Sequence, residues 1–202
     1  MTRFITKDSP LVLASASPRR KRLLRQIGIP FRTLSSRVKE DLLSRDPLMN
    51  ARLLAEAKAQ AVVQKCAGNW ILGADTIVVL NRAVLGKPSD EDEAFSMLRQ
   101  LSGKEHRVIT GFCLVAPDSK KAHSEAVVTR VTFKALTRRE ILGYVATGEP
   151  FGKAGSYGIQ GIGAFLVKGI TGSYTNVVGL PLSALVSALL ATGALKEFPI
   201  HS

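Results

Sequence analysis

Short apolar runs alternate along the chain with longer stretches in which apolar residues return every three or four positions. The runs predict strands and the longer stretches predict helices. Because the two kinds of block alternate, the pattern favours an α/β protein. Strands are predicted at residues 11–14, 31–34, 70–80, 107–116, 125–133 and 164–167, and helices at residues 19–27, 89–101, 137–146 and 184–191. A further helix of about 18 residues is predicted to begin at Asp46 and Pro47.

Local signals mark where these elements begin and end. Pro18 suits the first turn of a helix, Gly28 suits its end, and residues 81–84 are predicted to turn the chain. Residues 143–179 contain 10 of the 17 glycines, which indicates a backbone that bends closely around something. The predicted helix caps are Ser17, Ser89, Thr137 and Ser183.

The composition is that of a globular protein. The 202 residues are 46% apolar and 22% charged, so one domain spanning residues 1–202, with a sizeable core, is expected. No apolar run approaches the roughly 18 residues of a membrane helix, and the first residues lack a secretory signal. Two cysteines and three scattered histidines show no zinc-binding spacing. We therefore expect a cytoplasmic protein without a membrane partner.

Positive charge is concentrated near the N-terminus. The net charge is +12, and residues 1–60 contribute +8 of it, with the densest cluster at residues 19–25. Such a field attracts phosphorylated ligands, nucleic acid or acidic surfaces, although a basic helix face is often simply solvated. The sequence has no RNP pattern, zinc finger or basic zipper, so charge alone does not establish nucleic-acid binding.

The segment SASPRR follows the first predicted strand and opens the first predicted helix. Helix N-termini bind anions, and arginines on the first turn would add planar, multi-donor cations. The segment predicts a phosphate-binding site, with an ordinary capped surface helix as the alternative. The candidate residues are Ser15, Ser17, Arg19 and Arg20.

Acidic side chains occur at two places that suit catalysis or metal binding. Asp75 and Thr76 interrupt the apolar run ILGADTIVVL, and an aspartate at a strand end can take a proton from water or help to bind Mg²⁺. The alternative is a turn residue satisfied by backbone amides. Glu40, beside Asp41, would add a second carboxylate unless this pair lies on a solvated loop.

Two lysines and a glycine-rich segment complete the candidates. Lys58 lies on an alanine-rich helix face and Lys87 follows a predicted hairpin; both are candidate phosphate ligands or surface residues. The segment FGKAGSYGIQGIG (residues 151–163, the glycine-rich segment) is not a Walker loop. Within it, Tyr157 and Gln160 are candidates to contact a base or sugar, with a flexible surface loop as the alternative. None of the histidines or cysteines is a candidate for the site: His106 and His123 are predicted to be exposed, and Cys66 and Cys113 to pack in the core.

Several blocks together resemble the Maf family of nucleoside triphosphate pyrophosphatases. They are SASPRR, GADTIVV, LGKPSDEDEAFSMLRQLSGKEHRVITG, KAGSYGIQG and GSYTNVVGLPL, in this order, between residues 11 and 190. The resemblance implies an elongated, mixed sheet flanked by helices, related to inosine triphosphatases (the Maf/Ham type), with a cleft between two lobes. It also implies hydrolysis of a nucleoside triphosphate to the monophosphate and pyrophosphate with a divalent cation, Mg²⁺ or Mn²⁺.

The same resemblance implies roles for single residues. Asp75 corresponds to the proton acceptor and also to a metal ligand, together with Glu40, although Lys39 stands where the family usually has an acid. Phosphate contacts are implied for Arg19, Arg20, Lys58 and Lys87.

Arg19, Thr76 and Gln160 match the branch of the family that acts on dTTP and UTP, including modified pyrimidine nucleotides. The alternatives are a pyrophosphatase for 7-methyl-GTP or another purine triphosphate, and a basic regulator that binds nucleic acid or a division protein, since the family name refers to septum formation. We expect the chain to bind a nucleotide substrate and to form a homodimer. We do not expect nucleic acid as a primary partner.

Overall fold

The computed structural model describes residues 4–36, 38 and 44–200 of the chain. The strands are β1 (Leu11–Leu13), β2 (Phe31–Thr33), β3 (Ile71–Leu80), β4 (Ala83–Leu85), β5 (Glu105–Val115), β6 (Lys121–Phe133) and β7 (Val167–Thr171). The α-helices are α1 (Pro18–Gln26), α2 (Pro47–Gln60), α3 (Glu91–Leu101), α4 (Arg138–Val145), α5 (Tyr174–Val178) and α6 (Leu182–Ala191). Short 3₁₀ turns form η1 (Val63–Lys65), η2 (Ala154–Ser156) and η3 (Ile162–Leu166). None of the helices within the described ranges is long and apolar enough to span a bilayer.

The strands form one seven-stranded sheet in the order β2-β1-β3-β5-β6-β7, with β4 paired to β3. β1 runs parallel to β2 and β3, whereas β4 is antiparallel to β3 and β7 is antiparallel to β6. The predicted α/β class, with a mixed sheet flanked by helices, is therefore confirmed.

The chain divides into two compact units. The first unit comprises residues 1–75, 110–127 and 179–202, and the second comprises residues 76–109 and 128–178. Three of the four boundaries fall inside β3, β5 and β6, so these three strands each supply residues to both units, and the fourth follows α5.

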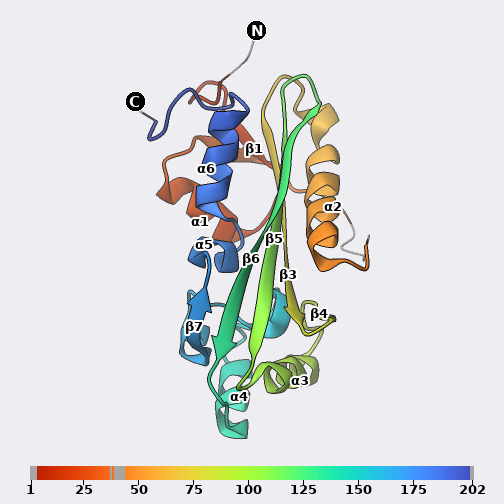
Figure 1. The fold of residues 1–202 in the computed structure, drawn as a ribbon, viewed down its shortest axis with the longest axis vertical. Helices are drawn as coiled ribbons and strands as arrows, with labels where there is room; N and C mark the ends of the chain where they lie inside the picture. The colour runs from red at the N-terminus through yellow and green to blue at the C-terminus, as the bar shows by residue number, and fades with distance from the viewer. Residues whose placement is uncertain (1–3, 37, 39–43, 201–202) are drawn as a thin grey trace. The chain divides into compact units, whose positions relative to one another are not determined.

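In the first unit, α2 packs on the sheet through small residues, and Figure 1 shows the helix alongside β3 and β5. A Cβ atom at Gly73 would lie 2.1 Å from the carbonyl oxygen of Ala55, and one at Gly111 would lie 2.2 Å from that of Ala51. Only glycine lets the helix backbone come so close to the strands. The adjoining core consists of Val12, Ala14, Ala55, Ala59, Val62, Val63, Cys66, Ile71, Cys113 and Val115.

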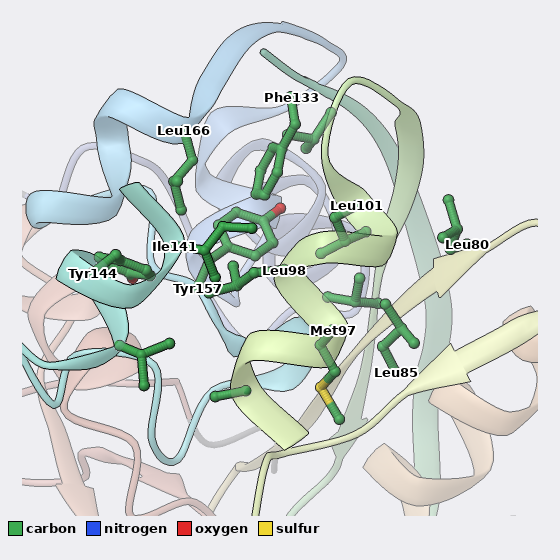
Figure 2. Close-up of a cluster of buried hydrophobic side chains, with 14 of the residues drawn as sticks. Leu80, Leu85, Met97, Leu98, Leu101, Phe133, Ile141, Tyr144, Tyr157 and Leu166 are labelled. Carbon is green, nitrogen blue, oxygen red and sulfur yellow. The ribbon is translucent and has the colours of Figure 1, made fainter. Parts of the chain in front are cut away.

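In the second unit, larger side chains form the core. Figure 2 shows them gathered from α3, α4, β6 and the glycine-rich segment. The large members include Met97, Leu98, Leu101, Phe133, Ile141, Tyr144, Tyr157 and Leu166. The predicted capping box of α4 is confirmed, because the side chains of Thr137 and Glu140 each bond the other's backbone N–H.

Some predicted boundaries are wrong. Ala164 belongs to η3, and the strand begins only at Val167. Pro181, not Ser183, occupies the N-cap position of α6. α3 begins one residue later than predicted, because the side chain of Asp90 accepts the capping bond from the Glu93 N–H. Helix α5 was not predicted.

Candidate active site

The loop after β1 is tied together by Arg20. Its guanidinium, on a side chain only 8% exposed, donates from Nε to the carbonyl oxygen of Gly179 (2.8 Å) and from Nη1 to Oγ of Ser15 (3.0 Å). Ser15 Oγ also accepts a hydrogen bond from the Ser17 N–H (3.3 Å). Arg20 therefore links two segments of the first unit that lie 159 residues apart in the chain.

Ser17 and Arg19 lie at the start of α1. Ser17 occupies the N-cap position and Pro18 the first helical turn, as predicted, but among the described residues the Ser17 side chain makes no capping bond. Arg19 is half-buried, and burial lowers the pKa of its guanidinium. Arginine nevertheless keeps its charge at neutral pH, so Arg19 supplies a fixed cation at this helix end.

Lys58 and Asp75 form a buried ion pair. The Lys58 ammonium lies 2.5 Å from Oδ1 of Asp75, and the two side chains are 8% and 7% exposed. The close packing of α2 over Gly73 places Lys58 where it reaches Asp75, two residues further along β3 on the same face of the strand. The prediction that Lys58 lies on the inner face of its helix is confirmed.

The parallel register brings the start of the serine–arginine loop (residues 15–20) level with the first half of β3, in which Asp75 lies. Leu13 of β1 pairs with Leu72 of β3, and Ala14 N–H donates to the Leu72 carbonyl (2.8 Å). Ser15 lies two residues after Leu13, beyond the end of β1, and Asp75 lies three residues after Leu72, inside β3. Ligands of α/β proteins commonly bind outside the carboxyl ends of parallel strands. Ser15 lies beyond the end of β1, but Asp75 lies inside β3, so the prediction of an aspartate at a strand end is wrong.

The second unit contains Thr76, Lys87 and Gln160. Lys87 is exposed and follows Gly86, whose carbonyl oxygen accepts a hydrogen bond from the Gly155 N–H (2.9 Å). This bond brings the glycine-rich segment to the residue before Lys87. A Cβ atom at Gly155 would lie 2.9 Å from the Val78 side chain, and Thr76 shares that face of β3.

Within the glycine-rich segment, Gln160 and Tyr157 have different environments. Gln160 is exposed on a turn, where it is able to meet a ligand. Tyr157 is 6% exposed and its ring packs edge-on against Phe133 and His106, so its predicted contact with a base is wrong.

His106 is buried, not exposed as predicted. It is 2% exposed and its Nε2 lies 2.8 Å from the Tyr157 hydroxyl. Burial lowers the pKa of His106 to about 4, so the imidazole is neutral at pH 7. The predicted packing of the cysteines is confirmed: both are buried, and burial raises the pKa of Cys113 to about 12.

Two residues without a predicted role organise the same segment. Glu149 and Tyr144 hydrogen-bond to its backbone at Gly158, Ile162 and Gly163. The only sequence signal was the spacing of the glycines after Glu149, which indicates a close approach but does not say to what.

Only one of the two predicted metal ligands lies within the described structure. Glu40 lies outside the described residues. Within residues 4–36, 38 and 44–200, no group of three or more His, Cys, Asp or Glu side chains is arranged to hold a metal ion. Asp75 supplies one carboxylate, and Mg²⁺ is commonly bound by one or two carboxylates together with substrate phosphates and water. The donor set thus fits a cation that arrives with a triphosphate.

These features define a class: a mixed α/β protein with a serine–arginine loop after its first strand and a buried carboxylate inside the parallel strand beside it. The chain belongs to the Maf family, since residues 10–192 match the family model described as Maf-like protein.

Curated relatives align along nearly the whole chain. A dTTP/UTP pyrophosphatase of Geobacter sp. (strain M21) is 50% identical over 190 residues, covering 94% of this chain and 98% of that protein. One of Geobacillus sp. (strain WCH70) is 47% identical, covering 91% and 98%. One of Nitratidesulfovibrio vulgaris is 46% identical, covering 98% and 95%.

Among solved structures, a nucleoside-triphosphatase / dITP/XTP pyrophosphatase from Mycobacterium abscessus aligns with a TM-score of 0.38 and 15% identity, covering 63% of this chain and 75% of that one. The Staphylococcus aureus Ham1 protein aligns with a TM-score of 0.40 and 14% identity, covering 61% and 71%.

Proposed function

We propose that this chain hydrolyses dTTP and UTP to the nucleoside monophosphate and pyrophosphate. The observation that carries the proposal is the buried Lys58–Asp75 pair in the middle of β3, next to the strand that leads into the serine–arginine loop. About 50% identity to proteins named dTTP/UTP pyrophosphatase, over nearly the full length, supports the same reaction.

In the proposed reaction, Asp75 accepts a proton from water. Its Oδ1 is held by the Lys58 ammonium, so the proton goes to Oδ2. The water oxygen forms a bond to the α-phosphorus, and the bond from that phosphorus to the bridging oxygen of pyrophosphate breaks. A positioned carboxylate base of this kind contributes roughly 10²–10⁴-fold to a rate.

The basic groups act on the triphosphate. Arg19 and Lys87 would bind its oxygens directly, because both carry charge on side chains that reach the surface. Lys58 would stabilise negative charge that develops beside Asp75. The guanidinium of Arg20 already bonds Ser15 and Gly179, so its contribution is to hold the hydroxyl and backbone groups of the loop in place and to add positive potential.

A divalent cation, Mg²⁺ or Mn²⁺, is part of the proposal. Asp75, with Glu40, would hold it, and when bound it would neutralise phosphate charge and polarise the phosphorus.

Base recognition is proposed for Arg19, Thr76 and Gln160. The Gln160 amide offers one donor and one acceptor, which match the O4 and N3–H of uracil and thymine. The cytoplasm as the location and a homodimer as the assembly remain predictions.

The test is an assay of purified protein with Mg²⁺ or Mn²⁺ and a panel of dTTP, UTP, CTP, GTP, ATP and 7-methyl-GTP. Chromatography separates monophosphate and pyrophosphate from diphosphate and phosphate. We expect monophosphate and pyrophosphate from dTTP and UTP. Release from 7-methyl-GTP alone would keep the reaction and overturn the specificity. No release from any nucleotide, with folded protein, would favour a basic binding protein instead.

A further inference from the structure

The end of the glycine-rich segment folds around a single carboxylate. Oε2 of Glu149 accepts a hydrogen bond from the Ile162 N–H (2.8 Å), and Oε1 accepts one from the Gly163 N–H (3.0 Å). Oε1 also accepts a bond from the Tyr144 hydroxyl (2.9 Å). A carboxylate that accepts backbone N–H groups makes shorter and stronger bonds than a neutral acceptor.

Tyr144 extends this network to the other side of the turn. Its hydroxyl accepts a hydrogen bond from the Gly158 N–H (3.1 Å) while it donates to Glu149. The side chain is only 2% exposed and lies in the core of the second unit (Figure 2). The two side chains therefore bond the backbone on both sides of Gln160.

The glycines make this approach possible. A Cβ atom at Gly161 would lie 2.3 Å from Oε2 of Glu149, and one at Gly163 would lie 2.5 Å from the Tyr144 hydroxyl. Any larger residue at these positions would push the carboxylate or the hydroxyl away. The spacing of the glycines is thus explained by the Glu149–Tyr144 pair.

Gln160 needs a fixed backbone if it is to distinguish bases. A carboxamide has one donor and one acceptor side by side, and turning it over exchanges them. In one orientation it matches uracil and thymine, and in the other it matches cytosine. A loose turn would let the carboxamide meet the base from several positions and so in either orientation, whereas a fixed turn holds it at one position relative to the base.

The charge state of Glu149 suits this task. Burial raises the pKa of the carboxyl, but hydrogen bonds from Gly163, Tyr144 and Ile162 outweigh burial, so the pKa is lower than usual. The side chain is therefore an anion with two acceptor oxygens at neutral pH.

We propose that Glu149, supported by Tyr144, is a positioning residue that fixes the turn bearing Gln160 and thereby sets the preference for uracil and thymine over cytosine. This inference rests on the proposed function, since it concerns the substrate that the same site selects. Neither side chain takes part in the hydrolysis.

The experiment compares kcat/KM for UTP and CTP in the full-length protein and three variants. Glu149→Gln keeps the shape of the side chain but replaces one acceptor oxygen by a donor, which would face an N–H group. Tyr144→Phe keeps the ring and removes the hydroxyl, and it serves if the first variant fails to fold. Glu140→Gln is the matched control, because this carboxylate caps α4, the helix of Tyr144, and bonds Thr137 rather than the turn.

We expect the UTP:CTP ratio of kcat/KM to fall about tenfold in Glu149→Gln and Tyr144→Phe, the effect of roughly one hydrogen bond. The fall should come from a higher KM for UTP with kcat unchanged, because the reacting phosphates are not touched. Amide hydrogens of Ile162 and Gly163 should exchange faster with solvent in both variants. The control should keep the wild-type ratio and exchange rates.

A separate variant, Gln160→Ala, distinguishes a failure of the inference about Glu149 from a failure of the specificity proposed for Gln160. A reduced ratio in Gln160→Ala with a wild-type ratio in Glu149→Gln and Tyr144→Phe would overturn the inference and leave the proposed function standing. A wild-type ratio in Gln160→Ala would overturn the specificity assigned to Gln160, and the inference with it. Equal losses in the two variants and in Glu140→Gln would indicate general destabilisation and would also overturn the inference.

Discussion

Helices of the two units pack on their strands in opposite ways. In the first unit, α2 presents alanines to Gly73 and Gly111, so that backbone meets backbone. In the second unit, α3 buries Met97, Leu98 and Leu101 among aromatic and aliphatic side chains (Figure 2). The first arrangement leaves little room for anything except small residues, while the second fills a wide space with large ones.

The two kinds of helix packing suit different tasks. Close packing in the first unit holds the charged Lys58–Asp75 pair inside a rigid framework of helix and strand. In the second unit the helices and strands support loops, and the polar candidates Lys87 and Gln160 are exposed on them. Precise placement of reacting groups favours helices and strands, whereas recognition is commonly carried by loops on a stable core.

The largest expected effect concerns the buried Lys58–Asp75 pair. In Asp75→Asn, the amide oxygen still accepts a bond from Lys58, but the side chain no longer takes a proton, so we expect kcat to fall about 10²–10⁴-fold. Circular dichroism should show a folded protein. Asp118→Asn, an exposed residue of the same unit that pairs weakly with Lys120, is the control and should keep full activity. Wild-type turnover in Asp75→Asn would remove Asp75 from the role of base.

The next effect concerns the buried histidine of the second unit. The pKa of His106 is about 4 in the folded state because of burial, against about 6.5 in the unfolded chain. Between these values the unfolded state binds more protons, so the free energy of unfolding should decrease as the pH falls from 6.5 to 4, by about 3 kcal/mol. Urea unfolding at a series of pH values measures this slope.

His106→Gln should flatten the slope in that pH window. His123→Gln is the matched control, because His123 is only partly buried on β6 and pairs with Glu125. An equally steep slope in the His106→Gln variant would show that other groups govern the acid stability of the protein.

A smaller effect tests the close packing of α2. Gly73→Ala would place a methyl group 2.1 Å from the Ala55 carbonyl oxygen, so the helix must move. We expect a loss of stability of about 1–3 kcal/mol, measured by urea unfolding. Because α2 carries Lys58, pyrophosphate release should fall as well, even at temperatures where the variant is fully folded. Full activity in a folded Gly73→Ala would contradict the view that this packing positions Lys58.

The smallest effect has the opposite sign. Gly143 lies inside α4, and a Cβ atom there would meet nothing within 4 Å. Gly143→Ala should therefore stabilise the protein by about 1 kcal/mol, since alanine favours the helix more than glycine does. Thermal unfolding of this variant and Gly73→Ala, measured side by side, compares a glycine that packing requires with one that it does not.

Local signals predicted much of the fold. Pro18 and Gly28 bracket α1, and the capping box at Thr137 begins α4, because these residues act on the backbone next to them. The alanine face around Lys58 and the polar Asp75 within an otherwise apolar strand are also visible in the sequence. Structural features that depend on residues adjacent in the chain can thus be predicted from the sequence.

Other features depend on contacts between distant segments and gave no local signal. His106 looked exposed because its burial results from Phe133 and Tyr157, which lie far along the chain. The bond that Arg20 donates to Gly179 and the bonds that the Ile162 and Gly163 N–H groups donate to Glu149 depend on how the chain folds back. The sequence predicted which residue types belong to the site but not which of them support the others.

The residues on the alanine-rich face of α2 also lose unequal amounts of conformational entropy when the protein folds. Alanine and glycine have no side-chain rotamers to restrict, so ordering Ala51, Ala55 and Gly73 costs backbone freedom alone. Lysine is among the side chains with most rotamer freedom, and fixing one costs roughly 1.5–2 kcal/mol. Among these four residues, the side-chain entropy lost on folding therefore falls on Lys58 alone. Once the protein is folded, Lys58 is already ordered, and a substrate that binds there need not restrict it again.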